Sequence, residues 1–388
     1  MLIFLIFCKL GAVSGERLRY TVGRRGKTVY FRQFPSTFQA AAAADQEVPL
    51  NTYMIKKTMI ESAISRGIRE MDDDPERVIR RFVDLGKQFS GNRFQDHVFS
   101  VMQELLNNEK SAYYDMVHSL LTNIDEEKIK TFGINFGYMS WAYGAHEIRR
   151  TEKEEGFCIP WSIRLRLDFS CPDGPGLPEL TSLIEQGQQL GIYAYFIRQS
   201  GFCSSYEHLE LFERFKDCAF VCLLERGLLT AAQVQVLKVL RNTLVSLPAE
   251  DPETMLTADL LRDQKLLFSL HAGYTDGTID TVIPQTMDKV LATSTPIFLL
   301  VGEDTASQTA ASQAYRSRLE QLYPCVIMDY TGDGRSISQV LVRHDNLLEI
   351  GADGKIIEPR AHRGEPFPFD IPLKDALARI MPGYTAEE

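Results

Sequence analysis

The fold is decided by residues 156–171, which read GFCIPWSIRLRLDFSC and are followed at 172–176 by the turn PDGPG. Between Ser162 and Phe169 apolar and polar side chains alternate, which is the period of a β-strand with one face against a core. The polar positions are Arg164, Arg166 and Asp168. Cys171 follows shortly afterwards and precedes the Pro/Gly turn. The stretch therefore predicts a strand that ends in a short loop carrying one thiol.

The composition is that of a soluble globular protein. With 388 residues, of which 44% are hydrophobic and 24% charged, the chain can bury a sizeable core and fits one large or two medium domains. Its formal net charge of -10 argues against a general nucleic-acid binder, which needs a basic face. No later segment approaches the ~18 apolar residues of a membrane-spanning helix. We therefore expect neither nucleic acid nor a membrane as a partner.

The cysteines and histidines show no metal or disulfide pattern. The seven cysteines lack paired spacing, which predicts a reducing, cytoplasmic location. The one Cys-x3-Cys pair, Cys218 and Cys222, lies in an apolar run that we interpret as a buried strand. The seven histidines include no His-x3-His pair, so no metal site is predicted.

Residues 1–53 have two interpretations. The apolar start, Met1 to Cys8, has no preceding basic residue and is too short for a typical signal peptide. Residues 9–32 are basic, with Glu16 as their single acidic residue. This segment is either a basic, disordered leader or sequence upstream of a true start at Met54. We favour the second, because the first clear pattern begins near Met54.

The remaining chain divides into three predicted regions. Residues 54–155 show apolar positions three and four apart and predict four or five helices, one of them starting at 72–75. Residues 156–330 alternate short apolar strands with amphipathic helices, which predicts parallel pairing in a partial barrel. Residues 331–388 predict a small β extension and a closing helix. The expected late strands are 340–342, 347–350 and 355–357, and the closing helix is 373–380.

Three segments resemble a known family. They are NFGYMSW at 135–141, CIPW at 158–161 and SLIEQGQQLGIY at 182–193. Together they resemble one bacterial branch of the radical S-adenosylmethionine (SAM) superfamily. The resemblance implies an α/β fold, namely a partial (β/α)6 TIM-like barrel with an N-terminal helical region and a SPASM- or twitch-like C-terminal extension. Such enzymes hold a [4Fe-4S] cluster through Cys-x3-Cys-x2-Cys and bind SAM at its open iron.

The motifs for that chemistry are missing at three places. Cys171 matches the first cluster cysteine, but residues 172–176 supply no second or third, and one thiolate cannot hold the cluster. Where the family has Gly-Gly-Glu-Pro, the sequence at 199–202 is QSGF. Arg360 stands where an auxiliary-cluster cysteine would be. The resemblance is thus to a degenerate member, a pseudoenzyme for which we expect no cofactor.

Polar residues at the predicted strand ends form the candidate site. Asp168, Arg198, Glu225 and His271 could converge at the barrel mouth and offer acid, base and anion-binding groups, or could simply be solvated loop residues. Neither a Gly-x-Ser-x-Gly nucleophile nor a glycine-rich phosphate loop is present. We predict a non-catalytic protein that binds an active radical SAM relative, a peptide or a small molecule. The alternatives are an enzyme using the mouth residues for non-radical chemistry, or a radical SAM enzyme whose atypical cluster site recruits Cys158 or Cys203.

Overall fold

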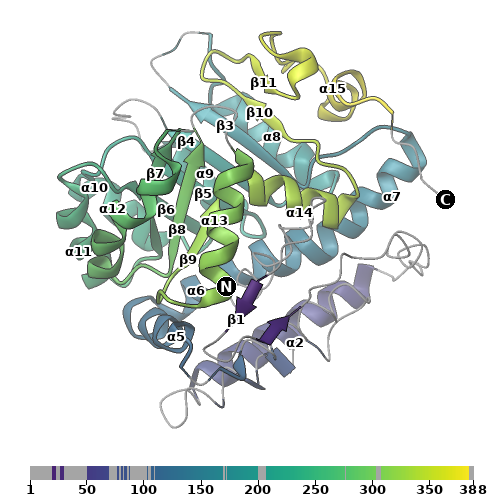
Figure 1. Ribbon diagram of the computed structural model, residues 1–388. Helices are drawn as coiled ribbons and strands as arrows, with labels where there is room; N and C mark the ends of the chain where they lie inside the picture. The colour runs from purple at the N-terminus through teal and green to yellow at the C-terminus, as the bar shows by residue number, and fades with distance from the viewer. Residues whose placement is uncertain are drawn as a thin grey trace.

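The computed structural model describes residues 20–22, 27–29, 50–69, scattered positions between 77 and 110, and 111–168, 171, 173–199, 207–275, 277–302 and 307–383. Its main feature is a nine-stranded sheet that curls into an open barrel (Figure 1). The strand order is β11-β10-β3-β4-β5-β6-β7-β8-β9. The strands are β3 (Ser162–Leu167), β4 (Ala194–Gln199), β5 (Ala219–Leu224), β6 (Thr243–Pro248), β7 (Phe268–Tyr274), β8 (Ile297–Gly302), β9 (Val326–Asp329), β10 (Leu348–Ile350) and β11 (Ile356–Glu358).

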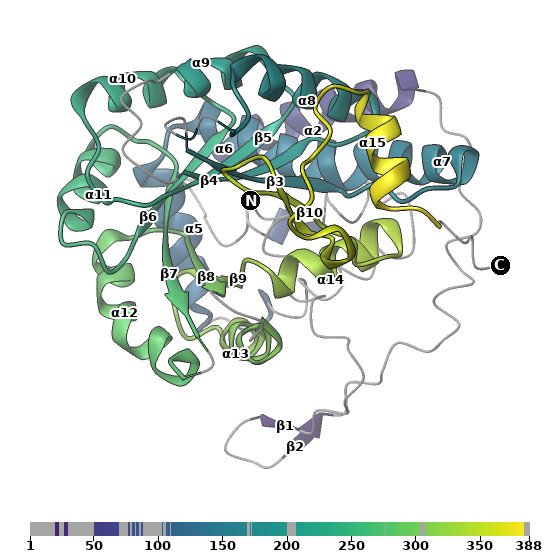
Figure 2. The same cartoon turned by 90° about the horizontal axis from the view of Figure 1, so that it is seen from above.

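Helices connect the strands and cover the outside of the sheet. All neighbours from β10 to β9 are parallel, so each connection must cross over the sheet, and a helix lies in every crossover from β3 onward. Figure 2 shows α8 to α12 as an arc around the curled strands. These helices are α8 (Leu177–Gln189), α9 (Glu207–Arg214), α10 (Ala231–Val239), α11 (Thr254–Asp263), α12 (Ile279–Thr293), α13 (Ser307–Glu320) and α14 (Gly332–Val342).

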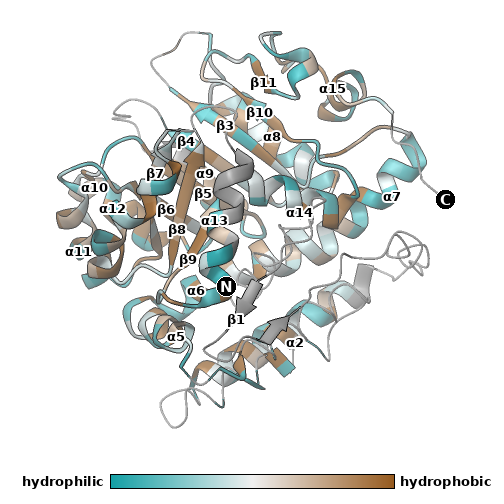
Figure 3. Cartoon of the chain, viewed as in Figure 1, coloured by the Kyte–Doolittle hydropathy of each residue, from teal (hydrophilic) through white to brown (hydrophobic). Residues whose placement is uncertain are grey.

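Hydropathy explains why the central strands lie inside. β5 and β8 are nearly continuous apolar runs, and all but the last residue of each is buried. Such runs are typical of parallel strands, which have both faces covered. Figure 3 shows these strands as hydrophobic and the helices around them as mixed, with hydrophilic outer turns. No helix in the described part of the chain is long and apolar enough to cross a membrane.

The predicted N-terminal helical region is confirmed where it is described. Its helices are α2 (Leu50–Arg69), α5 (Ala112–Asn123), α6 (Glu126–Gly133), the wide π-type helix η4 (Ile134–Gly144) and α7 (Ala145–Glu155). Asn135 ties η4 to the barrel, because its side-chain amide donates to the main-chain oxygens of Lys216 and Cys218, just before β5. The helix start predicted at 72–75 lies outside the described residues. Within residues 1–53, β1 (Tyr20–Val22) and β2 (Lys27–Val29) pair antiparallel.

The C-terminal segment shares a sheet with the barrel. β10 pairs parallel with β3, and β11 pairs antiparallel with β10. A short turn of helix, η5 (Arg360–His362), and helix α15 (Leu373–Ile380) follow. The closing helix has the predicted bounds. The extension thus adds two strands to the barrel sheet, with β10 beside β3 and β11 at the edge.

The predicted fold class, an α/β partial barrel with an N-terminal helical region, is confirmed. The strand series is longer than expected, because residues 243–248 form β6 and make seven strands from β3 to β9 in the described part. The strand predicted at 340–342 is wrong, since these residues end helix α14. The buried residues of α14 include Ile337, Ser338, Leu341 and Val342, which have helical spacing. Gly332 and Gly334, which are typical of a loop, concealed this spacing in the sequence.

Candidate functional site: the mouth of the barrel

The strand register decides which side chains face the inside of the curled sheet. Tyr195 of β4 donates its hydroxyl to the main-chain oxygen of Ile184 in α8, so this face of the strand meets the outer helices. Phe220 of β5 stacks on Phe212 of α9 at 4.0 Å on the same face. Residues at alternate positions therefore face inward. The inward set on the first two strands and on β10 is Arg164, Arg166, Phe196, Arg198 and Glu349.

Two arginines lie side by side at the carboxyl end of the sheet. Arg166 of β3 is the direct register partner of Arg198 of β4. Arg166 Nε donates to Glu349 Oε1 at 2.8 Å, and the Arg166 side chain is 41% exposed. Arg198 is half-buried, and its side chain has neither an ion pair nor a hydrogen bond to any residue that the structure describes. Among the described residues, the Glu349 carboxylate therefore pairs with Arg166 and leaves the adjacent Arg198 without a carboxylate partner.

A third arginine forms the floor below this pair. Arg164 is 2% exposed, donates Nη2 to the main-chain oxygen of Tyr330 at 2.7 Å, and lies 4.3 Å from the centre of the Tyr330 ring. Phe196 packs edge-on against the same ring at 5.6 Å. Burial raises the pKa of Tyr330 to about 12, so the phenol is neutral. Gly334 permits this packing, because any side chain there would collide with the Arg164 guanidinium.

His271 lies on the inner face of β7 and is uncharged. Its Nδ1 lies 3.0 Å from Ser246 Oγ, and Ser246 is buried on neighbouring β6. Burial, and secondly the charge of Arg198, lower the pKa of His271 to about 3. At neutral pH the imidazole is therefore neutral and provides a hydrogen-bonding group beside a cation.

The structure places the four predicted mouth residues at or near the carboxyl ends of their strands. It brings Arg198 and His271 close enough to interact electrostatically. Asp168 follows the carboxyl end of β3 and Glu225 follows that of β5, and Glu225 is exposed. A shared role for all four stays a prediction. Sequence reasoning missed Arg166 and Glu349 as site residues, although the alternation in β3 already placed Arg166 on the face of Asp168.

The cysteines determine whether a [4Fe-4S] cluster fits this mouth. Cys171 lies just beyond β3, at the mouth. Cys218 and Cys325 come directly before β5 and β9, so they lie at the far end of the sheet, and Cys222 lies on the helix-facing side of β5. Among the described residues the mouth thus offers one thiol, fewer than the three or four that a cluster takes. Cys203 lies outside the described residues.

The structure describes the other two positions where the family motifs are missing only in part. Gln199 ends β4 and is buried, while residues 200–202 are outside the described part. Arg360 is exposed in η5 and donates Nε to Glu358 Oε1 at 3.4 Å. Cys158 precedes β3 and is separated from Cys171 by the length of that strand, roughly 20 Å for six residues at ~3.3 Å each. This separation argues against a cluster that joins Cys158 to Cys171.

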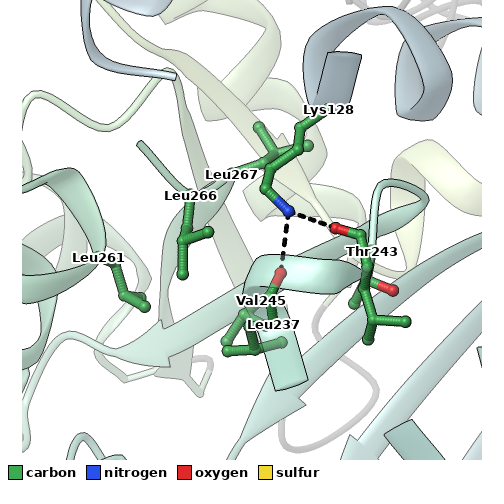
Figure 4. A pocket seen from close by; sticks show the side chains of 8 residues that line it. Lys128, Leu237, Thr243, Val245, Leu261, Leu266 and Leu267 are labelled. Carbon is green, nitrogen blue, oxygen red and sulfur yellow. Dashed lines mark hydrogen bonds between the residues drawn. The ribbon is translucent and has the colours of Figure 1, made fainter. Parts of the chain in front are cut away.

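A recess at the opposite end of the sheet has a structural explanation (Figure 4). Lys128 of α6 enters it and donates Nζ to the main-chain oxygens of Leu237, Lys238 and Leu240 at 2.9, 2.9 and 2.5 Å. These carbonyls end helix α10, where a cation is favourable. Burial lowers the pKa of Lys128 to about 8. Lys128 is a helix cap, and the recess is not a candidate binding site.

The open, mostly parallel sheet, its outer helices and the N-terminal helical region define a partial α/β barrel. Comparisons with protein-family models and with curated protein sequences find no match. Among solved structures the chain is similar to SuiB of Streptococcus suis bound to S-adenosylmethionine, with 10% identity over 60% of this chain and 66% of SuiB and a TM-score of 0.45. SuiB bound to precursor peptide SuiA gives 11% identity, 61% and 68% coverage and a TM-score of 0.44.

Proposed function

We propose that this chain is a non-catalytic binding protein whose radical SAM-like barrel holds an anionic ligand at its mouth. The observation that supports this proposal most directly is the position of Arg198. This half-buried arginine lies directly beside Arg166 and has no partner among the described side chains. We infer that the ligand presents a carboxylate, either on an acidic peptide segment of a partner such as an active radical SAM relative or on a small molecule.

Electrostatics support an anion at this position. Neighbouring strands lie about 4.8 Å apart, and like charges directly opposite each other destabilise a sheet. Glu349 neutralises Arg166, which leaves the charge of Arg198. A carboxylate can accept two parallel hydrogen bonds from one guanidinium, and such charge-assisted bonds are about twice as strong as neutral ones. The neutral His271 adds a hydrogen-bonding group without a competing charge.

The same geometry argues against catalysis at the mouth. A general base works best with a pKa near the working pH, whereas His271 has a pKa of about 3. One thiol at the described part of the mouth gives a poor site for an iron-sulfur cluster. We also propose a cytoplasmic location, which is supported by free thiols at Cys158, Cys171, Cys218, Cys222 and Cys325.

Anaerobic reconstitution tests the cluster part of the proposal. The purified full chain is incubated with iron, sulfide and reductant, desalted, and analysed for iron and sulfide per chain together with its visible absorption. We expect a colourless protein with iron far below one equivalent. About four irons per chain with matching sulfide, followed by S-adenosylmethionine cleavage, would overturn the non-catalytic assignment.

Ligand binding tests the role of the arginine pair. A panel of small mono- and dicarboxylates and acidic peptides is screened by thermal shift, and hits are quantified by calorimetry. We expect Arg198→Gln to weaken a hit about 10- to 100-fold, because a hydrogen bond to a charged group contributes ~1.5–3 kcal/mol. Arg262→Gln is the matched control, since Arg262 pairs with Asp259 on the surface. Equal affinity in wild type and Arg198→Gln would refute this site.

A further inference from the structure

A cluster of three potential metal ligands lies at the end of the sheet opposite the mouth. Glu152 lies in the last turn of α7, and the helix then ends at Gly156 with a left-handed C-cap. The chain turns back through Cys158 and enters β3. His344 lies two residues beyond the end of α14, and α14 packs on α7. Three separate segments thus converge on one point.

The three side chains have the spacing of a coordination site. One ligand atom from each of Glu152, Cys158 and His344 lies within 4.8 Å of the other two. His344 Nε2 is 2.7 Å from Glu152 Oε1. Tetrahedral zinc sites join sulfur at ≈ 2.3 Å with nitrogen and oxygen at about 2.0–2.2 Å, so small movements of the side chains would place a zinc ion between them.

The second carboxylate oxygen of Glu152 gives independent evidence that a cation binds here. Glu152 is 0% exposed, and its Oε1 accepts hydrogen bonds from the main-chain nitrogen of Ile159 at 2.7 Å and from His344. Its Oε2 is buried and has no hydrogen-bond partner. A buried carboxylate oxygen without a partner is costly, and a cation would satisfy it.

We propose that Glu152, Cys158 and His344 bind one Zn²⁺ ion. The donor set, one carboxylate, one thiolate and one imidazole, is the set that zinc accepts. The charges also balance, because a divalent cation neutralises a carboxylate and a thiolate and leaves no net charge to bury. The His344 side chain is 13% exposed, so the fourth position can be filled by water from that side.

Loading requires two local proton changes. Cys158 loses its thiol proton to solvent as the sulfur coordinates. His344 binds the metal through Nε2, so Nε2 carries no proton in the loaded site and Nδ1 carries the proton of the ring. Without the metal, Nδ1 accepts a long hydrogen bond of 3.4 Å from the main-chain nitrogen of Asn346. This contact is lost when Nδ1 carries the proton. The side chain of Asn346 also hydrogen bonds to Cys158 and remains as a support for the sulfur.

The position of the ion gives it a structural role. It would join the end of α7, the entry into β3 and the turn between α14 and β10. β10 brings Glu349, the partner of Arg166, to the sheet. The proposed ion would thus fix the segments that position both β3 and its neighbour.

Zinc titration of the full chain tests the site. The protein is stripped with a chelator, and Zn²⁺ is added in competition with a chromogenic indicator. We expect one zinc ion per chain. Cys158→Ser and His344→Gln should each weaken binding by more than about 100-fold, the upper range for loss of even a supporting residue. Cys325→Ser and His362→Gln are matched controls, since Cys325 is a buried thiol elsewhere and His362 pairs with Glu365 at the surface.

Cobalt provides a second readout, which tests the thiolate ligand in the wild-type chain directly. Co²⁺ added to the stripped wild-type chain should give a thiolate-to-cobalt charge-transfer absorption and tetrahedral visible bands, and Cys158→Ser should lack the former. Zinc below one equivalent, a cobalt spectrum without thiolate absorption, or unchanged affinity in Cys158→Ser would each overturn the site.

Discussion

The substitution His271→Asn should remove a large part of the acid sensitivity of this fold. His271 has a pKa of about 3 in the native chain, against an ordinary value of 6.5 when unfolded. The native imidazole stays neutral as the pH falls, while the unfolded one takes up a proton below pH 6.5. The stabilisation is therefore complete above pH 6.5 and is lost progressively from there down to pH 3. For these two pKa values, proton linkage gives a loss of about 2 kcal/mol between pH 7 and pH 5.

The assay is urea unfolding at pH 7 and pH 5, followed by the fluorescence of the two buried tryptophans, Trp141 and Trp161. The wild type should lose about 2 kcal/mol more than His271→Asn over this interval. Asn is chosen because its side-chain amide can still hydrogen bond to Ser246. Arg198→Gln should give an intermediate loss, because the Arg198 charge is the second cause of the lowered pKa. An identical pH dependence in wild type and His271→Asn would refute the reasoning.

Two further substitutions test the packing around the barrel. Arg318→Met should cost about 3–5 kcal/mol in urea unfolding, because it leaves the carboxylate of Asp333 buried without its bidentate partner. Gly334→Ala should cost about 1–3 kcal/mol by the same measurement, since its methyl group collides with the Arg164 guanidinium, which is held too firmly to move. Gly277→Ala, whose methyl group meets nothing nearer than 3.8 Å, should stay within ~0.5 kcal/mol of wild type.

Each of these two predictions can be contradicted by a specific result. A loss below 1 kcal/mol for Arg318→Met, the size expected for a surface pair such as Arg262 with Asp259, would mean that the Arg318 pair is not buried in solution. Equal effects of the two glycine substitutions would mean that Arg164 does not lie against α14.

Local pattern was sufficient for the elements that decide the fold. The alternation at 162–169 predicted the strand found at 162–167, and the apolar spacing at the C-terminus predicted Leu373–Ile380. Pattern failed where neighbouring signals were short or mixed. β6 begins only four residues after the end of the helix at Val239, and no Gly or Pro between them marks a turn in the sequence. α14 begins with Gly332 and Gly334, which are poor helix formers, and its stability comes from the face it buries.

The site was less predictable because its pairs are far apart in sequence. Arg166 and Glu349 are 183 residues apart and meet because β10 pairs with β3. Glu152 and His344 are separated by 192 residues, so no short metal-binding spacing exists to be found. The alternation of β3 does show that Arg166 shares a face with Arg164. Which acidic residue meets that face depends on the strand order, and strand order is not a local property of sequence.

The two proposed sites should act independently, because β3 separates them. Its six residues span roughly 20 Å, with the arginine pair at one end and Cys158 before the other. Zinc at about 100 times its dissociation constant should raise the free energy of unfolding by about 2.7 kcal/mol if it binds only the folded chain. It should leave the affinity of a carboxylate probe for Arg198 unchanged, which calorimetry with and without chelator measures. If zinc changed that affinity tenfold, the two ends of β3 would be coupled by about 1.4 kcal/mol, and the two sites would not be independent.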